Sequence, residues 1–123
     1  MKILVVDDEP VQLETICRGL RLYGHHCLQA INGTAALEVL AGPEGASVEL
    51  LLTDLTMPDT TGYQLIQEVT RTRPGLPIVV FTGLHSSPDL GAVREGGIPV
   101  LQKPFGPDAL MNIIRKLCPS CCD

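Results

Sequence analysis

The segment Val48-Glu49-Leu50-Leu51-Leu52-Thr53-Asp54-Leu55-Thr56-Met57-Pro58 carries an aliphatic run that ends in one carboxylate, Asp54, and stops at Pro58. A run of this length between turn-forming residues is typical of a strand buried on both faces, in the middle of a parallel sheet with helices on either side. A charged residue at the end of such a strand lies in the crevice where doubly wound folds bind their ligands. The segment therefore predicts a central strand that presents Asp54 at the edge of a sheet.

Length and composition indicate a single domain. The chain has 123 residues, of which 45% are hydrophobic and none is Trp, so it can bury one aliphatic core. We expect one domain over residues 1–123, with 118–123 as a tail. The formal charge of −5 contains no basic block, which argues against binding to nucleic acid or to an acidic membrane surface.

The amino-terminal aliphatic stretch is short. Residues Ile3 to Val6 are followed at once by acid, which is far too few apolar residues for a secretory signal or a membrane span. We therefore expect a cytoplasmic protein.

The five cysteines form an odd set in a chain that can build a proper core, which favours reduced thiols over a disulfide scaffold. Cys17 and Cys27 lie among apolar residues and are interpreted as small core hydrophobes. The tail, with Cys118, Cys121 and Cys122, contains a C-x-x-C but no second pair that would complete four zinc ligands. A frayed terminus is favoured there, with metal binding or redox chemistry as the minor alternative.

Aliphatic strand patterns alternate with helical patterns along the whole chain. Strands are expected at 3–6, 26–31, 48–54, 77–82 and 98–102, and helices at 10–23, 35–40, 63–73, 86–95 and 105–117. The first helix shows an apolar stripe of Val11, Leu13, Ile16, Cys17 and Leu20. The fourth is the weakest, because a glycine inside it costs about 1 kcal/mol and a glycine pair ends it early.

This alternation predicts an α/β fold with a parallel sheet and right-handed crossovers. The polar second strand and the fifth, which contains Pro99, suit the two edges of the sheet. Both features agree with a doubly wound, flavodoxin-like sheet of order 2-1-3-4-5 with helices on both faces. Composition alone leaves open which central strands are neighbours.

Polar side chains end four of these strands. In a parallel sheet Asp7, Asp8, Asp54, Thr82 and Lys103 converge at one edge. Carboxylates about 4 Å apart repel by about 4 kcal/mol per pair at an effective dielectric near 20, so the cluster needs a cation, and Mg²⁺ suits an all-oxygen site. A metal on one side and an ammonium on the other would neutralise a transferring phosphoryl group while Asp54 attacks phosphorus.

The same residues resemble the receiver domain of two-component response regulators, which has a chemotaxis-regulator-like fold. The resemblance covers about residues 2–117 and is carried by five pieces in order: Asp7-Asp8, Asp54 with Met57-Pro58, Gly62, Thr82-Gly83 and Lys103-Pro104-Phe105. Each piece alone is weak, but together they are specific.

The resemblance implies a role for each position. It makes Asp54 the phospho-acceptor. Asp8 and Asp54 would bind Mg²⁺ directly together with the backbone carbonyl of Thr56, and Asp7 would act through a metal-bound water. The phosphoryl group would be contacted by Thr82, Gly83 and Lys103, and the loops would be shaped by Pro58, Gly62 and Pro104. The donor is a phosphohistidine on a sensor histidine kinase or phosphotransfer protein. Phosphorylation then changes the surface of helix four, strand five and helix five for an unknown output partner. The domain assists its own phosphorylation and dephosphorylation but is not otherwise an enzyme.

Val100 stands where the family has an aromatic switch residue. A valine has one stiff χ1 and a small side chain, so it cannot report the state by swinging between exposed and buried rotamers. We therefore expect the conformational response in the backbone of residues 83–97.

The sequence also permits other interpretations. The acidic turn after the first strand, Thr82 and Lys103-Pro104 could each be a cap or a loop if taken alone. A haloacid-dehalogenase-type phosphohydrolase also uses an attacking Asp, but its general acid would stand at Thr56, and an inert binding module would usually have lost an acid or the lysine.

The wider context of the domain is also open. The ending Gln102 to Phe105, close to the carboxyl terminus, looks somewhat more like the receiver of a hybrid sensor kinase than like a stand-alone receiver or a trimmed piece. Ile98-Pro99 replaces the acidic pair of dimerising receivers, which favours a monomer or weak dimer.

Overall fold

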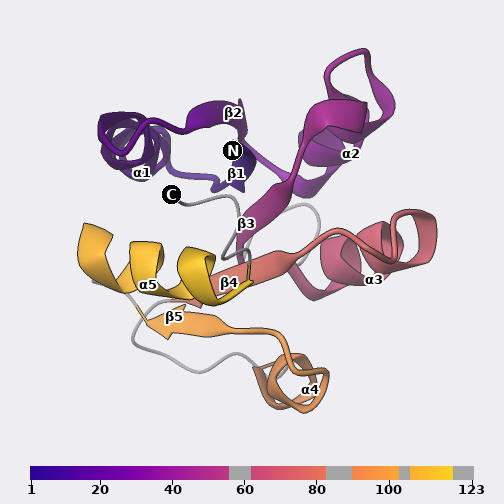
Figure 1. Cartoon of the computed structure of the whole chain (residues 1–123). Coiled ribbons are helices and arrows are strands. Elements are labelled where there is room, and N and C mark those ends of the chain that lie inside the picture. The colour runs from indigo at the N-terminus through magenta and orange to yellow at the C-terminus, as the bar shows by residue number, and fades with distance from the viewer. Residues whose placement is uncertain (56–61, 83–89, 103–105, 118–123) are drawn as a thin grey trace.

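The computed structural model describes residues 1–55, 62–82, 90–102 and 106–117. These residues form one parallel sheet in the order β2-β1-β3-β4-β5 (Figure 1). The strands are β1 (Lys2–Val6), β2 (His26–Ala30), β3 (Leu50–Asp54), β4 (Ile78–Thr82) and β5 (Val100–Gln102). The predicted doubly wound α/β fold is therefore confirmed, with the polar second strand and the proline-flanked fifth strand at the edges.

Helices cover both faces of the sheet. They are α1 (Pro10–Leu22), α2 (Gly33–Ala41), α3 (Gly62–Thr72), α4 (Leu90–Glu95) and α5 (Pro107–Leu117), with a short 3-10 turn, η1, at Gly45–Ser47. Buried side chains of α1 and α5 pack on one face, and those of α2, α3 and α4 pack on the other. No helix among the described residues is long and apolar enough to span a bilayer.

The burial of each strand matches the hydrophobicity of its residues. Every residue of β3 and β4 is buried, as expected where helices cover both sides, whereas β2 has one neighbouring strand and is half exposed. Burial of aliphatic surface at about 25 cal/mol per Å² makes this continuous central run the main stabilising feature of the sheet. It also fixes the position of Asp54, the last residue of β3.

The helix boundaries follow local chemistry. Pro10 occupies the start of α1, where the amide that it lacks would have no helical partner. Gly24 follows α1 with φ +86°, a conformation that glycine adopts without steric cost. Asn32 caps α2, because its side-chain oxygen accepts a hydrogen bond from the Ala35 amide at 2.7 Å.

Several details differ from the sequence predictions. The fifth strand begins at Val100 rather than at Ile98, so Pro99 lies before the strand and not inside it. Val11 is 80% exposed, so its assignment to the buried stripe of the first helix is wrong. The third strand begins at Leu50 rather than Val48, because the chain first makes the η1 turn, which was not predicted. The fourth helix is described only from Leu90, and its predicted start lies outside the described residues.

The prediction of reduced thiols at Cys17 and Cys27 is also wrong, because the structure joins them in a disulfide. Residue Cys27 pairs in register with Ile3, and α1 packs over the same strands, so the two Cα atoms lie 5.7 Å apart. Cys17 is fully buried, as predicted, whereas Cys27 is partly buried. The tail cysteines lie outside the described residues.

Candidate metal centre at the carboxyl edge of the sheet

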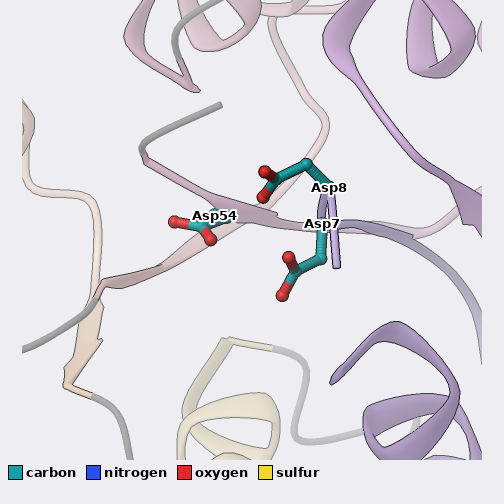
Figure 2. Close-up of side chains that lie close together, drawn as sticks. All are labelled: Asp7, Asp8 and Asp54. Atoms are coloured by element: carbon teal, nitrogen blue, oxygen red, sulfur yellow. The ribbon is translucent and has the colours of Figure 1, made fainter. Parts of the chain in front are cut away.

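Three carboxylates meet where β1 and β3 end. The two strands are neighbours, and their last paired residues are Val6 and Thr53, so Asp7 and Asp54 follow side by side. Asp8 comes next along the chain. Carboxylate oxygens of all three residues lie within 4.8 Å of one another, and Figure 2 shows the three groups surrounding one space. The predicted convergence of these acids is therefore observed.

The three acids differ in exposure. Asp7 is fully buried and Asp54 is 6% exposed, whereas Asp8 is open to solvent. The Asp7 side chain accepts a hydrogen bond from the Glu9 amide at 2.9 Å. Its own amide donates to the Ala30 carbonyl at 3.1 Å. Asp7 is thus held from both sides, and the solvent reaches the cluster beside Asp8.

This donor set fits a hard divalent cation. Buried carboxylates are costly unless they are paired or coordinate a metal, and adjacent like charges disfavour one another's ionised forms. Mg²⁺ takes oxygen ligands and keeps several waters, which the open side of the cluster allows. Asp7, Asp8 and Asp54 are the described residues that could hold it.

Thr82 ends the neighbouring strand. Asp54 pairs in register with Phe81, so Thr82 lies one residue further toward the same edge, with 4% of its surface exposed. The amide of Leu55 donates to the Phe81 carbonyl at 3.1 Å, which continues the pairing past the end of β3. A buried hydroxyl therefore stands at the strand end next to that of Asp54.

At Gly62 the chain lies directly against the backbone of Asp54 and Leu55. Its amide donates to the Leu55 carbonyl at 2.8 Å. A Cβ at this position would lie 2.3 Å from the Asp54 carbonyl oxygen and 2.6 Å from the Leu55 Cα. Only a residue without a side chain fits so close an approach.

The sequence of this chain matches that of a known protein family. The sequence model of the response regulator receiver domain matches residues 3–115. The chain belongs to the response regulator receiver family. The match includes four strands entirely, β1 from Ile3 onward, and the three clustered acids.

Two of the relatives of this receiver domain are much longer proteins. It is 34% identical over 113 residues to the transcriptional regulatory protein GlrR of Escherichia coli K12, covering 91% of this chain and 25% of that protein. It is 33% identical over 115 residues to the sensor histidine kinase RcsC of Salmonella typhi, covering 93% of this chain and 12% of that protein. The chain thus spans a quarter or less of these two relatives.

A solved structure shares the fold. The response regulator protein TrrA of Thermotoga maritima, in complex with Mg²⁺ and BeF, superposes with a TM-score of 0.80 at 27% identity, covering 94% of this chain and 97% of that one.

The remaining predicted positions of the receiver site fall in two groups. Val100 lies in β5, half-buried, paired with Val80 and packed with the core on the α2, α3 and α4 face. Residues Thr56, Pro58, Gly83, Lys103 and Pro104 lie outside the described residues.

Sequence reasoning missed the groups that hold Asp7. They are the backbone amide of Glu9 and the carbonyl of Ala30, and a backbone group leaves no signature in the side chains of a sequence. The only available signal was the expected edge pairing between the first and second strands.

Proposed function

We propose that this receiver domain accepts a phosphoryl group on Asp54 and thereby acts as the switch of a two-component phosphorelay. The observation that carries the proposal is the cluster of Asp7, Asp8 and Asp54, with carboxylate oxygens within 4.8 Å. Its donor is a phosphohistidine of a sensor histidine kinase or phosphotransfer protein. The similarity to a sensor histidine kinase and to a transcriptional regulatory protein supports a place between a kinase and an output partner.

The chemistry is a displacement at phosphorus. A carboxylate oxygen of Asp54 attacks, the phosphorus–nitrogen bond of the phosphohistidine breaks, and the imidazole leaves with its electron pair. When bound, Mg²⁺ neutralises negative charge on the phosphoryl oxygens. Asp8, Asp54 and the Thr56 carbonyl would hold the ion directly, and Asp7 through a water.

Two further side chains complete the proposal. Lys103 would place an ammonium group against a phosphoryl oxygen, and the hydroxyl of Thr82 would move toward the group once it is attached. The contact between Thr82 and the phosphoryl group exists only in the phosphorylated state, so it shifts the population of conformations. The α4, β5 and α5 surface is the proposed output surface, and the cytoplasm the proposed location.

Labelling with a small phosphodonor tests the proposal. The purified domain is incubated with radiolabelled acetyl phosphate with and without Mg²⁺, and acid-stable, base-labile incorporation is counted. Asp54→Asn should lose the labelling, because the attacking oxygen is gone. The matched control is Asp108→Asn, the same chemical change at an exposed residue of α5.

The possible results separate the candidate functions. Mg²⁺-dependent labelling of the parent and of Asp108→Asn, but not of Asp54→Asn, supports the phosphoacceptor. Labelling of Asp54→Asn at the stoichiometry of the parent would refute the assignment. An unlabelled parent would indicate an inert binding module. In a separate assay with an aryl phosphate as substrate, sustained turnover would indicate the phosphohydrolase alternative.

A further inference from the structure

A disulfide links α1 to the strand that follows it. Cys17 lies in the second turn of α1, and Cys27 is the second residue of the edge strand β2. Their Cα separation of 5.7 Å falls in the usual range for a disulfide. The crosslink closes the turn around Gly24 into a ring, with a sequence separation of 10 between the two cysteines.

The two sulfurs lie in different surroundings. Cys17 is fully buried among Leu13, Ile16 and Leu20 of the same helix face. Cys27 packs against this cluster but is only partly buried, and β2 has no strand on its outer side among the described residues. A thiol reagent therefore approaches the disulfide from the side of Cys27.

We propose that Cys17 and Cys27 form a reversible thiol–disulfide site that sets the stability of the β1-α1-β2 unit. Its reactants are a thiol or dithiol reductant in one direction and a small disulfide, such as oxidised glutathione, in the other. Disulfides that do form in reducing compartments are usually transient or redox-sensing, which fits a reversible pair.

The exchange balances in two steps. A reductant thiolate attacks the Cys27 sulfur, the bond between the cysteines breaks, and Cys17 leaves as a thiolate that takes up a proton. The second reductant thiol attacks the mixed disulfide, releasing the Cys27 thiol and an oxidised reductant. Two electrons pass to the protein, and the reverse sequence restores the crosslink.

The effect on stability follows from chain entropy. A crosslink restricts the unfolded chain and thereby stabilises the folded state. For a ring of this length in a domain of this size, reduction of the disulfide should lower the Tm by about 5–15 °C. The reduced thiols still fit their positions as small hydrophobes.

The site is separate from the acidic cluster. Cys27 pairs with Ile3 near the amino end of β1, whereas Asp7 follows the carboxyl end of that strand. The redox site therefore does not depend on the proposed phosphoacceptor function.

Thiol counting and thermal melting test the proposal. The full chain carries Cys118→Ser, Cys121→Ser and Cys122→Ser so that the tail cannot exchange with the pair. The protein, purified without reductant, is denatured and alkylated before or after dithiothreitol, and mass spectrometry maps the modified cysteines. Melting is measured with and without dithiothreitol, and again after reoxidation with oxidised glutathione.

The expected result is no alkylation of Cys17 or Cys27 before reduction, both alkylated afterwards, and a fall in Tm of about 5–15 °C that reoxidation reverses. The Tm of Cys27→Ser in the same background should lie near that of the reduced parent and should not change when dithiothreitol is added. Two free thiols after treatment with oxidised glutathione, or a Tm that is unchanged by reduction of a confirmed disulfide, would overturn the proposal.

Discussion

Gly62 shows how closely a single residue controls the acidic cluster. Gly62→Ala should lower the free energy of unfolding by about 1–3 kcal/mol, because the new Cβ would overlap the Asp54 and Leu55 backbone and force it to shift. Urea unfolding measures the loss. Labelling at Asp54 should also slow, since the same backbone positions the acceptor.

Gly75→Ala is the control for this substitution. Nothing lies within 4 Å of a Cβ at Gly75, so its stability should stay within about 0.5 kcal/mol of the parent. Equal stability of the two variants would mean that Gly62 does not approach the strand end as closely as the structure shows.

Asp8 is the exposed member of the cluster, and its removal tests the metal site. Asp8→Ala should weaken Mg²⁺ binding by about tenfold or more, because one direct carboxylate ligand is lost. A titration of Mg²⁺ against the protein measures the affinity. Glu9→Ala removes a neighbouring exposed charge that is not part of the cluster, and should leave the affinity nearly unchanged. Equal loss in both variants, or none in Asp8→Ala, would move the metal site elsewhere.

The convergence of the three acids was predictable from the sequence, but the backbone groups that hold Asp7 in place were not. Asp7, Asp8 and Asp54 were predictable because each ends or follows an aliphatic strand, and parallel strands place their carboxyl ends together. The placement of Asp7 depends on hydrogen bonds with the backbone amide of Glu9 and the backbone carbonyl of Ala30, which no side-chain pattern records.

The elements depend on their terminal residues. Helix α2 has only nine residues, and the Asn32 side chain satisfies one of its free amides. Asn32→Ala should therefore lower the free energy of unfolding by about 1 kcal/mol. Asn112→Ala, on the exposed side of α5, should be neutral or slightly stabilising, since alanine is the better helix former. Urea denaturation curves that show the same stability for both variants would exclude a capping role for Asn32.

The backbone of residues 83–97 is predicted to carry the conformational response. Val100 is already half-buried in the sheet, which fits a residue that does not swing. Activation by beryllofluoride with Mg²⁺ should increase protection from hydrogen exchange mainly in residues 83–97. Unchanged exchange there, with a change confined to β5 and α5, would contradict this prediction.

Element types were predictable from periodicity, but some boundaries were not. Val11 fits a helical apolar spacing, yet it lies in the first turn of α1 and is exposed. The η1 turn was missed because it is held in part by a tertiary contact that a local pattern does not show: the Arg73 guanidinium donates hydrogen bonds to the carbonyls of Gly45 and Val48.

For the whole molecule, the two edge strands were predictable from their composition, whereas the order of the three central strands rested on agreement with the doubly wound pattern. A polar second strand and a proline beside the fifth left three aliphatic strands for the centre. The Cys17–Cys27 disulfide was not predictable in the same way, since it depends on how α1 packs over β1 and β2.

The proposed function depends above all on Asp54 being the phosphoryl acceptor. The most direct measurement is to incubate the domain with acetyl phosphate and Mg²⁺, trap the acyl phosphate by borohydride reduction, and locate the modified residue by peptide mass spectrometry. We expect modification at Asp54, and we expect removal of Mg²⁺ with a chelator to abolish it. Modification at another residue, with the peptide containing Asp54 recovered unmodified, would contradict it.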